Sequence, residues 1–131
     1  MATRPVMEID NGFFSTRDEA MQDIIETGYW PTTYVSERMD ALPVHWHDHN
    51  SMGYVIEGST YLLDEVGERV TLEAGDRLRV PAGALHAEGE VTERITYIVA
   101  LEKPENFFDA FRMLDPVAWP SPEPLDHSPG N

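Results

Sequence analysis

The chain contains no cysteine among its 131 residues. This absence excludes disulfide bonds, thiolate metal ligands and a cysteine nucleophile. Basic residues are also scarce, because 9 lysines and arginines stand against 24 aspartates and glutamates, which gives a formal net charge of -15. A surface this acidic repels phosphate backbones and anionic lipid headgroups. We therefore expect neither a nucleic acid nor a membrane as a partner.

Long hydrophobic runs are missing as well. No segment has the roughly 18 consecutive apolar residues that a membrane-spanning helix needs, and residues 1–14 lack the apolar core of a secretory signal. We therefore expect a cytoplasmic protein. With 131 residues, of which 41% are hydrophobic, the chain has the size and the apolar content of one domain with its own core.

The N-terminal part, residues 1–31, is expected to form an arm with one helix. Thr16 and Glu19 make a capping-box pattern, and Gly28 is a typical helix stop, so the helix is predicted at about 17–27. Short segments separated by turn residues then fill 32–101, and such regular punctuation favours a β-sandwich or barrel. The predicted strands are 32–39, 43–48, 52–57, 60–65, 68–72, 77–80, 85–90 and 93–101.

The C-terminal part is predicted to contain a second helix within 102–114. Pro104 lies in its first turn, and its apolar face consists of Phe107, Phe108, Phe111 and Leu114. The segment 115–131 is rich in proline and is expected to be a flexible tail. His127 lies in this tail, and we assign it no role.

Three histidines carry the main chemical signal of the sequence. His45 and His47 are two residues apart, and in a strand this spacing directs both side chains to one face. His86 follows the turn-like segment 81–83 and would come from a second strand. Imidazole is a common ligand of transition metals, so the pattern predicts a metal site with these three ligands.

The spacing around these histidines resembles the two sequence motifs of the cupin family. Seven positions agree with the family pattern: His45, His47, Gly58, Gly75, Pro81, Gly83 and His86. The resemblance is to small single-domain bacterial cupins and is close over residues 45–90. It implies an all-β fold, the double-sheet jelly-roll barrel, with short N- and C-terminal helices at its flanks. It also implies a divalent metal ion held by the motif histidines in the barrel mouth.

Three positions depart from the family pattern, and one of them bears on the chemistry. Met39 replaces the opening glycine, and Glu90 replaces the closing asparagine. Ser51 occupies the place of the glutamate that completes the usual ligand set of three histidines and one carboxylate. A serine hydroxyl is a poor metal ligand unless it is deprotonated.

Three interpretations of Ser51 are open. In the first, the site is a three-histidine centre whose neutral ligands leave the full divalent charge for an anionic, chelating substrate. In the second, His49 or Glu90 supplies a fourth ligand. In the third, the metal is lost and the pocket binds a small molecule unaided. Glu88 and Glu90 are explained equally well as solvent-facing charges.

Two functions from different classes follow. The first is a metal-dependent enzyme, a dioxygenase-like oxygenase or else a lyase or isomerase, which acts on a small anionic or chelating molecule with Fe, Zn, Mn or Ni. Ser51, Glu90 and Tyr97 are its candidate catalytic or substrate-contacting residues. The alternative is a non-catalytic sensor or carrier that binds a small molecule in the barrel, with a structural metal or none.

A homodimer is expected from the strand faces. If the histidine face is the barrel interior, Trp46, Tyr54 and Ile56 point outward. An apolar patch of this size needs a cover, which the terminal helices or a second subunit could supply.

Overall fold

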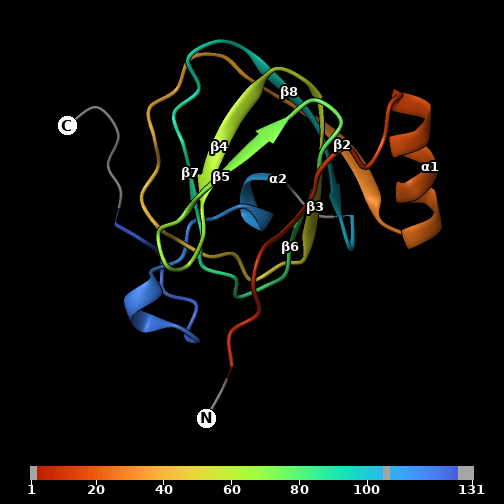
Figure 1. The fold of residues 1–131 in the computed structure, drawn as a ribbon. Coiled ribbons are helices and arrows are strands. Elements are labelled where there is room, and N and C mark those ends of the chain that lie inside the picture. The colour runs from red at the N-terminus through yellow and green to blue at the C-terminus, as the bar shows by residue number, and fades with distance from the viewer. Residues whose placement is uncertain (1–2, 105–106, 127–131) are drawn as a thin grey trace.

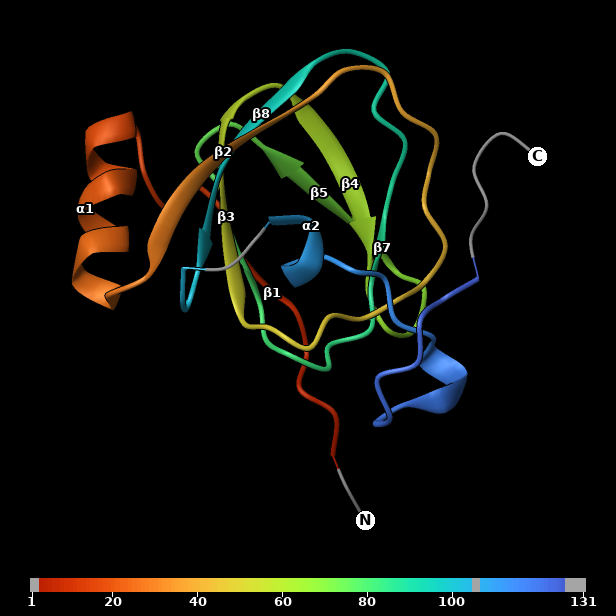
Figure 2. The ribbon, with the colours of Figure 1, turned by 180° about the vertical axis from the view of Figure 1, so that it is seen from behind.

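Two antiparallel sheets form the body of the protein, which is described here by a computed structural model covering residues 3–104 and 107–126. His127 therefore lies outside the described residues. Helix α1 lies outside the larger sheet, on the side away from β4 and β5 (Figures 1 and 2). The elements are β1 (Glu8–Asp10), α1 (Arg17–Thr27), β2 (Trp30–Ser36), β3 (Ser51–Glu57), β4 (Ser59–Leu63), β5 (Arg69–Glu73), β6 (Arg77–Val80), β7 (Ala87–Glu88), β8 (Ile95–Leu101), α2 (Phe107–Ala110) and the 3-10 helix η1 (Pro116–Ala118).

The strand order is that of a double-sheet jelly roll. The larger sheet has the order β1-β6-β3-β8-β2, and the smaller has the order β5-β4-β7. Inward-facing residues of both sheets meet in one core, where Val55 and Ile95 of the larger sheet join Leu62 and Leu72 of the smaller one. Burial of these apolar side chains is what holds the two sheets together. The all-β jelly-roll fold expected from the sequence is confirmed.

Helix α1 forms at the predicted residues and covers the outer face of the larger sheet. The hydroxyl of Thr16 accepts a hydrogen bond from the backbone N–H of Glu19 at 3.1 Å, and Gly28 ends the helix with a φ of 79°. The buried face of the helix, Ala20 and Ile24, packs in one cluster with sheet residues that include Tyr54. The helix is therefore the cover that this part of the sheet needs.

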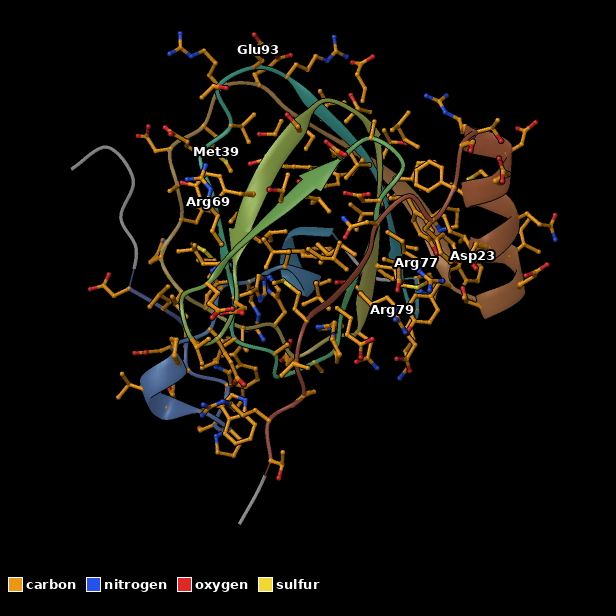
Figure 3. All side chains as sticks on the ribbon, in the orientation of Figure 1. Asp23, Met39, Arg69, Arg77, Arg79 and Glu93 are labelled. Carbon is orange, nitrogen blue, oxygen red and sulfur yellow. The ribbon has the colours of Figure 1, made fainter. Side chains whose placement is uncertain are left out.

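Ion pairs connect α1 and β1 to β6 of the larger sheet. Arg77 of β6 contacts Asp10 at 2.8 Å and Asp23 of α1 at 3.0 Å. Asp23 also accepts a hydrogen bond from the hydroxyl of the buried Tyr54. Figure 3 shows Arg77, Arg79 and Asp23 together between α1 and the larger sheet. None of the described helices is long and apolar enough to cross a membrane.

The C-terminal segment covers Trp46, the other aromatic residue that was expected to point outward. The indole N–H of Trp46 donates to the carbonyl oxygen of Asp115 at 3.1 Å, and its backbone pairs with Leu114. Trp46 is 4% exposed, and Tyr54 is fully buried. The chain itself thus supplies the cover, so these residues give no reason to expect a homodimer.

The structure differs from the sequence-based expectation in the C-terminal part. Helix α2 has four residues, Phe107–Ala110, instead of extending to Leu114. The side chains of Phe107 and Phe108, part of the predicted apolar face, lie outside the described part of the chain. The chain leaves the helical conformation after Ala110. Leu114 instead forms two backbone hydrogen bonds with Trp46, at 2.9 and 3.3 Å. Residues 115–126, expected to be flexible, include a 3-10 helix and a hydrogen bond from Leu125 to Met113 at 2.9 Å.

Gly58, between β3 and β4, cannot carry a side chain. Its φ is 92°, and an added Cβ would overlap the backbone carbonyl oxygen of Arg94. Gly67 has a similar φ of 82° but no atom within 4 Å of an added Cβ. We expect Gly67→Ala to lower the free energy of unfolding by about 1–2 kcal/mol, the cost of the left-handed backbone. We expect Gly58→Ala to lower it by about 2–5 kcal/mol, because overpacking adds to that cost.

Chemical denaturation of the two variants measures the difference. Equal losses in Gly58→Ala and Gly67→Ala would show that the close approach of Arg94 to Gly58 contributes nothing to the stability of the fold.

Candidate metal centre

His45 and His86 lie directly opposite each other on two neighbouring segments. Their backbones form a pair of antiparallel hydrogen bonds, at 2.9 Å from His45 to His86 and at 3.0 Å in return. Opposite residues of an antiparallel pair point to the same face. The imidazole centroids of His45 and His86 are consequently 4.6 Å apart.

His47 joins this pair from the same strand-like segment. Its ring centroid lies 4.9 Å from that of His45 and 5.2 Å from that of His86. The three side chains are only 1–4% exposed. Gly83 fixes the neighbouring turn, because its φ of 92° suits glycine and its N–H donates to the carbonyl oxygen of His47 at 2.9 Å. The turn residues of the second motif therefore place the His86 segment against the His45–His47 segment.

Each imidazole has its Nδ1 atom hydrogen-bonded to a backbone carbonyl oxygen. The distances are 2.7 Å from His45 to Pro43, 2.8 Å from His47 to Arg112 and 2.9 Å from His86 to Ala84. A carbonyl oxygen only accepts hydrogen bonds, so the proton of each neutral ring lies on Nδ1. The Nε2 lone pairs of all three rings are then available as metal ligands.

Glu88 brings a carboxylate to the three Nε2 atoms. It follows His86 by two residues and so lies on the same face of its strand. Its Oε2 atom is 3.1 Å from Nε2 of His45, and its Oε1 atom is 3.6 Å from Nε2 of His86. The four ligand atoms of His45, His47, His86 and Glu88 all lie within 4.8 Å of one another. These four residues are therefore positioned to bind a metal ion.

One carboxylate oxygen of this cluster lacks a hydrogen-bond partner. Oε2 of Glu88 is buried and has no hydrogen-bond donor. Nε2 of His45, 3.1 Å away, is an acceptor in the tautomer that its Nδ1 bond selects, so two acceptors face each other. Such an arrangement leaves a buried carboxylate unsatisfied, which is costly unless a proton or a cation lies between the two atoms.

The pKa values follow from the same geometry. Burial would raise the pKa of Glu88, but hydrogen bonds and charges of His45 and His86, whose Nε2 atoms become donors when they carry a proton, outweigh it and hold that pKa well below its ordinary value. Burial would lower the pKa of His86, but Glu88 raises it overall. Burial, together with the charges of His86 and His45, lowers the pKa of His47 to about 4. His47 is therefore neutral near pH 7, the state in which an imidazole binds metal.

The two residues considered as a fourth ligand from the sequence lie elsewhere. Nδ1 of His49 is 2.8 Å from a carboxylate oxygen of Asp48, beside a separate surface cavity. Glu90 is exposed, and its backbone carbonyl accepts a hydrogen bond from Thr60. Within residues 3–104 and 107–126, the carboxylate brought to the three histidines is that of Glu88. Its signal in the sequence is the spacing of two from His86, the same spacing that relates His45 and His47.

A cavity of about 310 Å³ lies over the cluster. Both sheets and the C-terminal residues Phe111 and Met113 line it. Ser51 and Tyr97 line this cavity, whereas Glu90 is not among its lining residues. Ser51 is 6% exposed. Burial, with the charges of Glu88 and Tyr34, raises the pKa of Tyr97, so its hydroxyl stays protonated at neutral pH.

Residues 37–100 form a cupin domain, as the sequence motifs indicate. The family model described as "Cupin domain" matches residues 37–100, which include all four residues of the cluster. No curated protein is significantly similar to this sequence.

Solved structures with the same fold are similar to this chain at low sequence identity. A DUF861 family protein from Thermotoga maritima is 19% identical with a TM-score of 0.54, over 72% of this chain and 98% of that one. A candidate mannose-6-phosphate isomerase from Ralstonia eutropha is 17% identical with a TM-score of 0.50, over 76% and 91%. A cupin-2 domain protein from Shewanella frigidimarina is 22% identical with a TM-score of 0.48, over 60% and 72%. At these identities the likeness to the first two structures establishes the fold alone.

Proposed function

We propose that His45, His47, His86 and Glu88 hold one divalent metal ion, and that the protein is a metal-dependent enzyme acting on a small chelating molecule. The observation that carries this proposal is the buried Oε2 atom of Glu88, which faces the acceptor Nε2 of His45 and has no donor. A cation at the centre of the four ligand atoms would satisfy all of them at once. Three imidazole nitrogens and one carboxylate suit Fe, Zn, Mn or Ni.

Glu88 changes the charge expected at the centre. Three neutral histidines alone would leave the full charge of a divalent ion, whereas the Glu88 carboxylate reduces the net charge to about +1. One anionic oxygen of a substrate would neutralise this charge. The replacement of the family glutamate by Ser51 is thus compensated, in this proposal, by a carboxylate from β7.

The side chains of the cavity prepare a substrate for reaction. A bound divalent ion would act as a Lewis acid and a template, and iron would also support chemistry with O₂. Tyr97 remains protonated and can donate a hydrogen bond to a substrate oxygen, as can the hydroxyl of Ser51. Apolar residues of both sheets line most of the cavity, and an apolar surrounding strengthens these polar interactions.

An oxygenase is the reaction class that the cavity supports best. Lyases and isomerases need a group that moves protons at neutral pH. Among the described residues that line the cavity, the histidines and Glu88 are engaged as proposed ligands, and the high pKa of Tyr97 makes it a poor base. An oxygenase needs no such side chain, because its reaction draws on the ion and on O₂ as co-reactant.

Oxygen uptake by the iron-loaded protein tests this proposal. We expect O₂ consumption with at least one member of a panel of 1,3-diketones and hydroxylated aromatic acids, and none with the metal-free protein. Absence of O₂ consumption with every panel member, in a protein shown to contain iron, would contradict the oxygenase assignment.

A small-molecule sensor or carrier is the second candidate. This function is favoured by the cavity of about 310 Å³, which is large enough to hold a small ligand. Binding in such a cavity does not require a reaction. A binding protein would be stabilised against heat by a compound of the panel but would not consume it. An enzyme would do both.

A further inference from the structure

Most of the cavity wall away from the metal cluster is apolar. Phe111 and Met113 contribute from the C-terminal segment, and strands of both sheets supply the rest. The aliphatic residues from the two sheets and the loops between them are Leu42, Leu62, Leu78, Val80, Val91, Ile95 and Val99. Such walls stabilise the hydrocarbon part of a ligand at roughly 25 cal/mol for each Å² that is buried.

Positive charge is missing from the same walls. Of the described residues that line the cavity, Glu88 is the one with a formal charge at neutral pH besides the histidines, and none is lysine or arginine. A phosphate monoester carries a charge of about -1.5 to -2 at pH 7 and needs several donors for its oxygens. The whole chain has a net charge of -15, which adds a further repulsion for a dianion.

We infer that the substrate has an apolar, hydrocarbon or aromatic body and a single chelating head with at most one negative charge, and that sugar phosphates and other dianions are excluded. This inference rests on the proposed metal centre, since one anionic oxygen balances the net charge of about +1 that Glu88 leaves on a divalent ion. Since none of the described residues of the walls is lysine or arginine, no described side chain neutralises a second charge.

Three probes separate the body of the ligand from its head. Benzohydroxamate has an aromatic body and a monoanionic chelating head, acetohydroxamate has the same head on a methyl group, and phenyl phosphate has the aromatic body with a dianionic head. Calorimetry on the zinc-loaded full chain measures the dissociation constants. We expect benzohydroxamate to bind at least about tenfold more tightly than acetohydroxamate, because the ring is buried, and at least about tenfold more tightly than phenyl phosphate.

A substitution at Met113 tests whether the lack of a cationic side chain in the cavity wall is what excludes dianions. Its side chain is partly buried and lines the cavity without belonging to the metal cluster. Met113→Arg should improve the binding of phenyl phosphate by about tenfold, the value of one favourable charge–charge contact in a partly buried site. Met113→Gln removes the thioether without adding charge and should leave phenyl phosphate as weak as in the original protein.

Each outcome bears on a different claim. If the protein binds zinc but prefers phenyl phosphate, or binds both hydroxamates equally, the inference is overturned while the metal centre stands. If the metal-free protein binds benzohydroxamate as tightly as the zinc-loaded protein does, the chelating head is contradicted. If the protein binds no metal, the proposed function fails and this inference fails with it.

Discussion

Replacing Glu88 with glutamine should lower the affinity of the protein for a divalent ion by about 100-fold or more. Loss of a residue that only supports a ligand typically costs about 10–100-fold, and Glu88 would supply both a ligand atom and the negative charge. The stability of the metal-free variant should stay within about 1 kcal/mol of the original protein, because the amide N–H can donate to Nε2 of His45 and so replaces the contact that the carboxylate makes with a protonated histidine. A large loss of metal affinity without a comparable loss of stability is expected of a residue whose main role is binding.

Glu90→Gln is the matched control for this variant. It removes the same charge two residues away, from an exposed side chain outside the cluster. Competition with a chromogenic chelator measures the affinity, and thermal unfolding measures the stability. Equal affinities in Glu88→Gln and Glu90→Gln would remove Glu88 from the ligand set.

Replacing Gly89 with alanine should also weaken metal binding, by about 10-fold or more, although Gly89 contributes no ligand atom. An added Cβ at Gly89 would lie 2.5 Å from a ring carbon of Tyr61, while its N–H donates to the carbonyl oxygen of Tyr61 at 2.8 Å. Arg69 lies over the ring of Tyr61 at 3.6 Å and limits its movement. The strain should therefore displace the strand end that carries Glu88, and a displaced ligand binds less well. We also expect a loss of about 1–3 kcal/mol in stability from the overpacking.

Gly53 offers the comparison for Gly89, because it lines the same cavity from β3. The nearest atom to its added Cβ is 3.7 Å away, which is an ordinary contact. Gly53→Ala should leave both metal affinity and stability nearly unchanged. Similar effects of the two substitutions on metal affinity would show that the position of Glu88 does not depend on the close packing of Tyr61 against Gly89.

The sequence predicts the histidines of the cluster well and its carboxylate poorly, for a reason that β7 makes clear. His45, His47 and His86 follow from strand alternation and from the turn at 81–83. Glu90 was considered as a ligand on the premise of a strand that runs straight past His86, but β7 ends at Glu88. The backbone of Gly89 instead bonds to Tyr61, and Glu90 is directed to the surface.

The C-terminal part shows a limit of reasoning from composition. Its prolines indicate a flexible tail, but amino-acid composition does not show which single apolar side chains pack against the rest of the protein. Leu114 is fully buried, and the indole N–H of Trp119 donates to the carbonyl oxygen of Gly83 at 3.0 Å. These contacts lie against Trp46 and the His86 turn, so the segment also supports the candidate site. The carbonyl oxygen of Arg112, which orients His47, comes from the same part of the chain.

Metal content by elemental analysis of the tag-free chain, with His86→Ala measured beside it, tests the central claim most directly. The proposed centre predicts about one divalent ion per chain, retained through dialysis, and its loss in a His86→Ala variant that keeps its folded circular-dichroism spectrum. A chain that holds no ion after reconstitution with Fe, Zn, Mn and Ni, or a variant that keeps the same ion, would contradict it.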